Sequence, residues 1–168
     1  MQRRTLLSVG VATGALLAVA GGTLALIRPG RRADVLTAPA RAMFAAVARA
    51  VLGQQLPVEQ SAQTRALEAH LSRVQAIIAG LPPAMQAEVD ELITVVASAP
   101  GRIALVGLTR DWSTATVSEV GQALQNMRQS SLSVRQQAYH ALRNMSNAAY
   151  FADAATWPAI GYPGPRSL

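Results

Sequence analysis

Apolar residues recur at three- and four-residue steps through most of the chain after residue 37, and no stretch alternates cleanly with period two. This spacing places the apolar side chains on one face of a helix, so it predicts a succession of amphipathic helices. A shorter apolar stretch, 102–108, is predicted as a brief helix, although a buried strand would look similar. The longer predicted helices span residues 40–52, 58–79, 84–98, about 117–129 and about 132–153. The residues expected to face inward are Met43, Phe44, Val47, Val51, Leu67, Leu71, Val74, Ile78, Met85, Val89, Leu92, Val96, Val117, Val120, Leu124, Met127, Tyr139, Leu142 and Ala149.

Helix-start and helix-stop residues separate these segments. Gly53, residues 80–83 and residues 100–101 carry the glycine and proline that end helices. Thr37 is expected to cap the first helix through its hydroxyl group. Residues 116–119, T-V-S-E, fit a capping box, in which the Thr and Glu side chains each accept a first-turn amide. The sequence therefore predicts an all-α fold, a compact bundle of five or six helices over residues 33–152.

The first 32 residues are typical of an export signal. A short basic start precedes an uncharged stretch from Thr5 to Ile27, which is the layout of a signal peptide. Arg3 and Arg4, followed by Leu6 and Leu7, resemble the twin-arginine signal, which implies export of a folded protein to the periplasm. The predicted location is therefore periplasmic.

Whether this segment is cleaved or kept as an anchor is left open by the sequence. A small-residue site, Ala18-Val19-Ala20, allows cleavage. Alternatively, the uncharged stretch would span roughly 34 Å as a helix, enough to cross a bilayer core and hold the protein at the membrane.

Residues 153–168 are predicted to form an irregular, aromatic and proline-rich C-terminal tail. Three prolines argue against both helix and strand, and Trp157 with Tyr162 makes the segment too aromatic for a solvated tail. These rings need a surface, either on this chain's own bundle or on a partner. The candidate partner-contacting residues are Tyr139, Tyr150, Phe151, Trp157, Pro158, Tyr162 and Pro163.

The basic charge of the chain is concentrated in the export segment. The formal net charge is +6, but five of the fifteen basic residues, all Arg, lie within residues 1–32. The remaining ten face nine acidic residues, so the folded part is nearly neutral and lacks the basic face of a nucleic-acid binder. The chain has no cysteine, which excludes disulfides, thiolate nucleophiles and cysteine-based metal sites.

The remaining polar residues do not form a recognisable catalytic pattern. His70 and His140, the only histidines, lack the spacing of a metal-binding helix, and each is interpreted as structural or surface-exposed. Asp111 and Asp153, each near a Trp, are interpreted as turn or N-cap residues. Without a convergent set of titratable groups, the sequence predicts no catalytic, cofactor or metal site on this chain.

The C-terminal half of the chain resembles the gluconate 2-dehydrogenase subunit 3-like family, whose members are small proteins with twin-arginine leaders. The most specific piece is W-P-A-I-G-Y-P-G-P, residues 157–165. Ala154 stands where the family often has proline. Other matching residues are Asp111-Trp112, Glu119-Val120, Ala123-Leu124, Met127-Arg128, Ser130-Ser131-Leu132, Arg135 to Tyr139 and Asn147 to Phe151.

This resemblance implies a non-catalytic accessory subunit that helps a larger enzyme to fold and carries it through the twin-arginine translocase. The implied partner is a flavin-dependent dehydrogenase of the glucose–methanol–choline type, which holds FAD, and a cytochrome c subunit often accompanies it. The alternative reading is a stand-alone, membrane-tethered periplasmic helical protein without an enzyme partner.

Overall fold

The computed structural model of the chain describes residues 30–32 and 35–164, and the fold over these residues is mostly helical. The predicted export residues Arg3, Arg4, Leu6 and Leu7 lie outside the described residues. The long helices are α2 (Ala38–Leu52), α3 (Gln60–Ala79), α4 (Pro83–Ala97), α6 (Val117–Arg128) and α7 (Ser133–Phe151). The short elements are β1 (Arg31–Arg32), β2 (Val35–Leu36), η2 (Gly53–Gln55), α5 (Ala99–Gly101), η3 (Arg102–Val106) and η4 (Ala154–Ile160).

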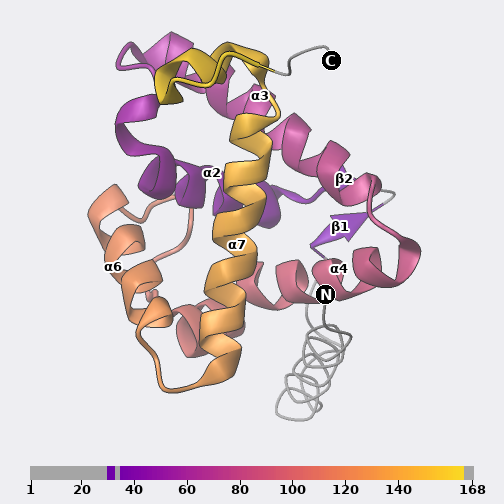
Figure 1. Cartoon of the computed structure of the whole chain (residues 1–168). Coiled ribbons are helices and arrows are strands. Elements are labelled where there is room, and N and C mark those ends of the chain that lie inside the picture. Colours follow the sequence, from indigo (N-terminus) through magenta and orange to yellow (C-terminus); the bar gives the residue numbers. More distant parts are fainter. Residues whose placement is uncertain (1–29, 33–34, 165–168) are drawn as a thin grey trace.

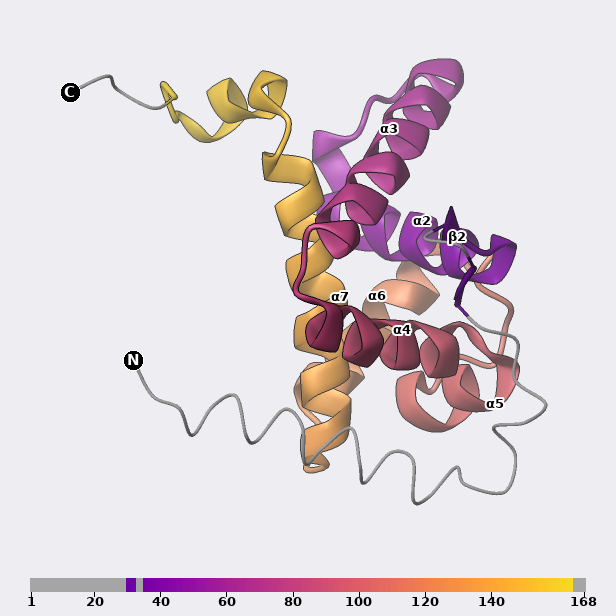
Figure 2. The same ribbon diagram turned by 90° about the vertical axis from the view of Figure 1, so that its right-hand side faces the viewer.

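The helix count and type confirm the predicted all-α bundle within the described ranges. Helix α7 runs the length of the molecule, and α2, α3 and α6 pack along it (Figure 1). Helix α4 crosses beneath α2 and joins the bundle through α5 and η3 (Figure 2). The single main core lies where these helices meet; its fully buried side chains include Met43, Phe44, Val74, Ile78, Ile93, Met127 and Leu142.

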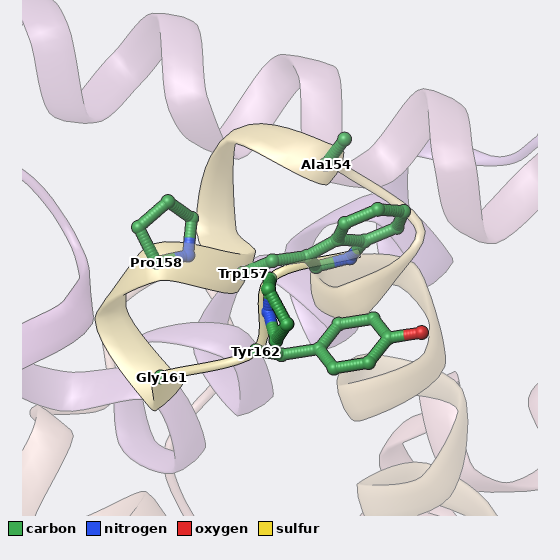
Figure 3. A pocket seen from close by; sticks show the side chains of 6 residues that line it. Ala154, Trp157, Pro158, Gly161 and Tyr162 are labelled. Carbon is green, nitrogen blue, oxygen red and sulfur yellow. The ribbon is translucent and has the colours of Figure 1, made fainter. Parts of the chain in front are cut away.

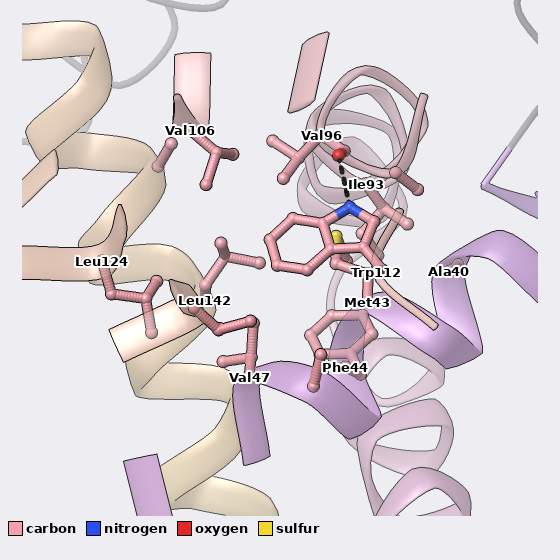
Figure 4. Packing of buried hydrophobic residues seen from close by; sticks show 14 of the residues in the cluster. Ala40, Met43, Phe44, Val47, Ile93, Val96, Val106, Trp112, Leu124 and Leu142 are labelled. Carbon is pink, nitrogen blue, oxygen red and sulfur yellow. Dashed lines mark hydrogen bonds between the residues drawn. The ribbon is translucent and has the colours of Figure 1, made fainter. Parts of the chain in front are cut away.

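Trp112 fixes the loop between η3 and α6 to this core. Its side chain is 2% exposed, and its indole N–H donates a hydrogen bond to the Val96 carbonyl oxygen over 3.1 Å (Figure 4). The predicted turn at Asp111 is confirmed, because its carboxylate accepts from the Ser113 N–H and also pairs with the buried Arg102 guanidinium at 2.6 Å. These hydrogen bonds and the ion pair hold the pKa of the Asp111 carboxyl below its usual value.

Residues Gly30 and Arg31 belong to the folded part, although they fall within the segment assigned to the leader. The Gly30 N–H donates to the Thr94 hydroxyl over 2.8 Å, and Arg31 pairs with Asp90 at 2.8 Å. A Cβ at Gly30 would lie 2.5 Å from Cγ2 of Ile93, so only glycine fits against α4 there. The folded domain therefore includes residue 30, and processing that keeps the fold must occur before it.

Several local predictions are corrected by the structure. The Thr37 hydroxyl does not cap α2; it donates instead to the Gly30 carbonyl oxygen. Met85 and Val117, both expected to face inward, are 41% and 52% exposed. The apolar stretch after residue 101 is helical as predicted, although it forms a π-helical turn, η3. Strands β1 and β2 form a two-residue antiparallel pair that the sequence pattern does not indicate. The capping box at Thr116 and Glu119 is confirmed.

Candidate docking surface at the C-terminal end

The end of α7 continues into an ordered C-terminal segment. The structure places a 3-10 helix, η4, where the sequence predicts irregular chain. The reason is that the fixed φ of proline is compatible with a 3-10 turn, so Pro158 fits inside it. The Asp153 side chain caps its first turn by accepting from the Ala155 N–H, which confirms the predicted capping role. Gly161 ends it with a φ of 71°, a conformation that favours glycine.

Trp157 forms the centre of this segment. Its indole N–H donates to the Phe151 carbonyl oxygen over 2.8 Å, and its ring meets the Tyr162 ring edge-on at a centroid distance of 5.3 Å (Figure 3). The backbone of Gly164 lies against another part of the same ring, because a Cβ at Gly164 would lie 3.3 Å from it. Trp157 is therefore half-buried and organises the tail, and its polar group is already satisfied.

The exposed apolar residues between the end of α7 and residue 163 form what we term the C-terminal docking surface. Tyr162 is 45% exposed, Ile160 is 56% exposed and Phe151 is 40% exposed. The prolines Pro158 and Pro163 are exposed beside them, and both line a hollow of about 310 Å³ together with Ala154, Trp157, Gly161 and Tyr162. The C-terminal docking surface is defined as Phe151, Pro158, Ile160, Tyr162 and Pro163.

Three of the predicted contact residues are not part of this surface as defined, and one of them, Trp157, is half-buried at its centre. Tyr150 is 9% exposed and packs with Leu52 and Leu56 in a second, smaller core cluster. Tyr139 is half-buried against the main core, more than three turns before the end of α7 at Phe151. The sequence pattern missed Ile160, which lies between Trp157 and Tyr162 in the sequence and is 56% exposed.

The described part of the tail, which ends at Gly164, extends away from the bundle beyond the start of η4. Helix η4 projects sideways from the end of α7: its first residues lie near α3, and its far end points away from the bundle (Figure 2). Its main packing among the described residues is against α7. Arg73 on α3 holds the start of η4 in place, because its Nε donates to the Ala149 carbonyl oxygen at 2.7 Å and its Nη1 pairs with the Asp153 carboxylate at 3.1 Å. Within the described residues, the start of η4 therefore borders α3 and η2, and the residues after it extend away from the bundle.

A separate pocket of about 330 Å³ lies between α3, η2 and the start of η4. His70 is part of its lining and is only 1% exposed, and neither ring nitrogen has a hydrogen-bond partner among residues 30–32 and 35–164. Burial, and secondarily the charge of Arg73, lowers the pKa of His70 to about 4, so the ring is neutral at physiological pH. His140, in contrast, is exposed on α7.

We expect the bundle to lose stability as the pH falls from about 6.5 towards 4. The unfolded chain binds a proton at His70 in this window and the folded chain does not, so the protonated imidazole favours unfolding. The shift corresponds to roughly 3 kcal/mol at most.

Urea unfolding at neutral pH and near pH 4.5 should show a smaller loss of stability on acidification in His70→Leu than in the wild type or in His140→Gln. Equal acid effects in all three proteins would contradict the assignment to His70. The charged groups facing His70, namely Arg73 on its own helix and Asp153 of the tail, are retained in every variant.

The other functional signals are few. In the part of the chain that the structure describes, no three His, Asp or Glu side chains gather in a way that could hold a metal ion. No helix within residues 30–32 and 35–164 is both long and apolar enough to span a bilayer. Comparison with models of known protein families, with curated proteins and with solved structures finds no match to this chain.

Proposed function

We propose that this chain is a non-catalytic accessory subunit that helps to fold and export a larger flavin-dependent dehydrogenase of the glucose–methanol–choline type, and that stabilises the complex. FAD and the substrate site belong to the partner, and a cytochrome c subunit is a further expected member. The chain travels by the twin-arginine route and acts in the periplasm.

The observation that carries this proposal is the C-terminal docking surface. A monomer in water gains nothing by holding Tyr162, Ile160 and Phe151 exposed on a projecting segment, because burying such side chains is favourable. Aromatic side chains are the usual anchors of protein interfaces. The internal hydrogen bond of Trp157 and the ion pair of Arg73 keep the segment ordered before a partner binds, which lowers the entropy cost of association.

The sequence of this segment supports the choice of partner. Residues 157–165 carry the most specific part of the resemblance to the gluconate 2-dehydrogenase subunit 3-like family, and these residues include most of the docking surface. The N-terminal segment with its paired arginines supplies an export signal for a partner that lacks one.

Replacing Arg3 and Arg4 together by Lys is expected to keep the partner enzyme in the cytoplasm. The proposed translocase selects the arginine pair, so a conservative change of both residues should block export without changing charge. The measurement is dye-linked flavin dehydrogenase activity in periplasmic and cytoplasmic fractions of the native host. Arg28→Lys, a matched change after the apolar stretch, should leave the distribution unchanged. Normal periplasmic activity in the double variant would reject the carrier role.

A further inference from the structure

The two ring nitrogens of His70, Nδ1 and Nε2, make no hydrogen bond to any described residue. A neutral imidazole offers one N–H donor and one acceptor nitrogen, and here both are buried without a partner in the described part of the chain. Such groups are rare in folded proteins because an unsatisfied buried polar atom is costly. A side chain in this position therefore points to a bound group that supplies the missing partner.

The rest of the pocket is suited to an uncharged occupant. Its lining is largely apolar and includes Leu52, Leu56 and Pro57 beside η2 and Ala66 and Ala69 of α3. The two charged groups of the lining, Arg73 and Asp153, neutralise each other through their ion pair. A charged ligand would have to give up water without gaining a free counter-charge.

We propose that this pocket is a binding site for a small, neutral organic molecule that has a compact apolar body and one hydroxyl group. The apolar body lies against the leucine and alanine side chains of the lining, and the hydroxyl group donates to the unprotonated nitrogen of His70. The imidazole turns about its Cβ–Cγ bond, a soft torsion, to bring that nitrogen to the pocket surface. A volume of about 330 Å³ is at the lower end of the range of small-molecule sites, which sets the size of the ligand.

This site is distinct from the C-terminal docking surface, and the inference does not depend on a flavoprotein partner. The two regions share only the η4 segment: Asp153, Ala155 and Thr156 border the pocket, whereas Ile160 and Tyr162 lie further along the tail. A failure of one proposal therefore leaves the other standing.

Phenol is a suitable probe, and toluene is its matched control without a hydroxyl group. The full chain labelled with ¹⁵N-histidine carries only two imidazole rings, so His140 serves as an internal reference. Titration with phenol at neutral pH is expected to shift the ring nitrogens of His70 saturably and to leave those of His140 unchanged. Toluene should bind at least about threefold more weakly because it cannot make the hydrogen bond.

Blocking variants test the location. Ala69→Trp places a large ring in the pocket from the exposed face of α3, and Ala155→Trp does so independently from η4. Either change should abolish the phenol-induced shift at His70 while the helical circular dichroism stays that of the wild type. In His70→Leu, thermal stabilisation by phenol should fall to the level given by toluene. No saturable shift at His70, equal shifts at both histidines, equal affinities for phenol and toluene, or full binding by both folded tryptophan variants would overturn the proposal.

Discussion

A chain carrying Ile160→Asp and Tyr162→Ser is expected to lose its flavoprotein partner while its bundle stays folded. Both side chains are about half exposed on the C-terminal docking surface, so neither change opens a cavity in the core. In a complex, the new carboxylate would be buried without a counter-charge and the tyrosine anchor would be gone. Losses of this kind cost at least about 2 kcal/mol, which corresponds to roughly 30-fold weaker binding.

The measurement is periplasmic flavin dehydrogenase activity in a host strain whose only copy of this chain is the variant. Activity should fall together with the amount of partner protein, while the purified variant keeps the helical circular dichroism of the wild type. Leu132→Asp is the matched control, because Leu132 is 58% exposed and lies at the opposite end of α7. Unchanged activity in the tail variant, or an equal loss in the Leu132 control, would count against docking through this surface.

Trp112→Ala is expected to destabilise the bundle by about 4 kcal/mol, the range typical of a buried tryptophan replaced by alanine. The change removes a side chain that is 2% exposed and leaves the Val96 carbonyl oxygen without its indole donor. Because small domains are only marginally stable, most of the variant should be unfolded at physiological temperature. Urea unfolding followed by circular dichroism gives the free energy directly.

The second tryptophan provides the comparison. Trp157→Ala alters the tail, whose contacts are mainly with itself and with the end of α7, so it should change the unfolding free energy of the bundle by less than about 1 kcal/mol. The two variants therefore distinguish the contribution of the core to the unfolding free energy from that of the tail. Similar losses of stability in both variants would show that the tail is part of the cooperative core, and the division of roles proposed here would fail.

The sequence pattern predicted the helices well where packing and periodicity agree. Leu71, Val74 and Ile78 follow the helical period and are all buried, and the capping box at Thr116 and Glu119 is present. The prediction of which apolar side chains face the core failed in the first turns of two helices. Met85 and Val117 lie in the first turns of α4 and α6, where the helix has not yet reached the core and the period no longer reports burial.

The tail and the His70 pocket were predicted less completely, for different physical reasons. Three prolines suggested irregular chain, but a 3-10 turn tolerates the φ of Pro158, so local geometry outweighed the general rule. His70 lies three residues after Leu67 and four before Val74, on the same apolar stripe, which is a sequence signal of burial. The lack of hydrogen-bond partners for its ring nitrogens among the described residues depends on how α3, η2 and η4 pack together, and a local sequence pattern does not predict this packing.

The most direct test of the central claim is purification of the tagged full chain from its native host in mild detergent, followed by a visible absorbance scan and a dye-linked dehydrogenase assay. The account predicts a flavin spectrum and dehydrogenase activity that elute with the chain and are absent with the Ile160→Asp, Tyr162→Ser variant. A chain that elutes without flavin, or that turns over a substrate once every other polypeptide has been removed, would contradict the claim.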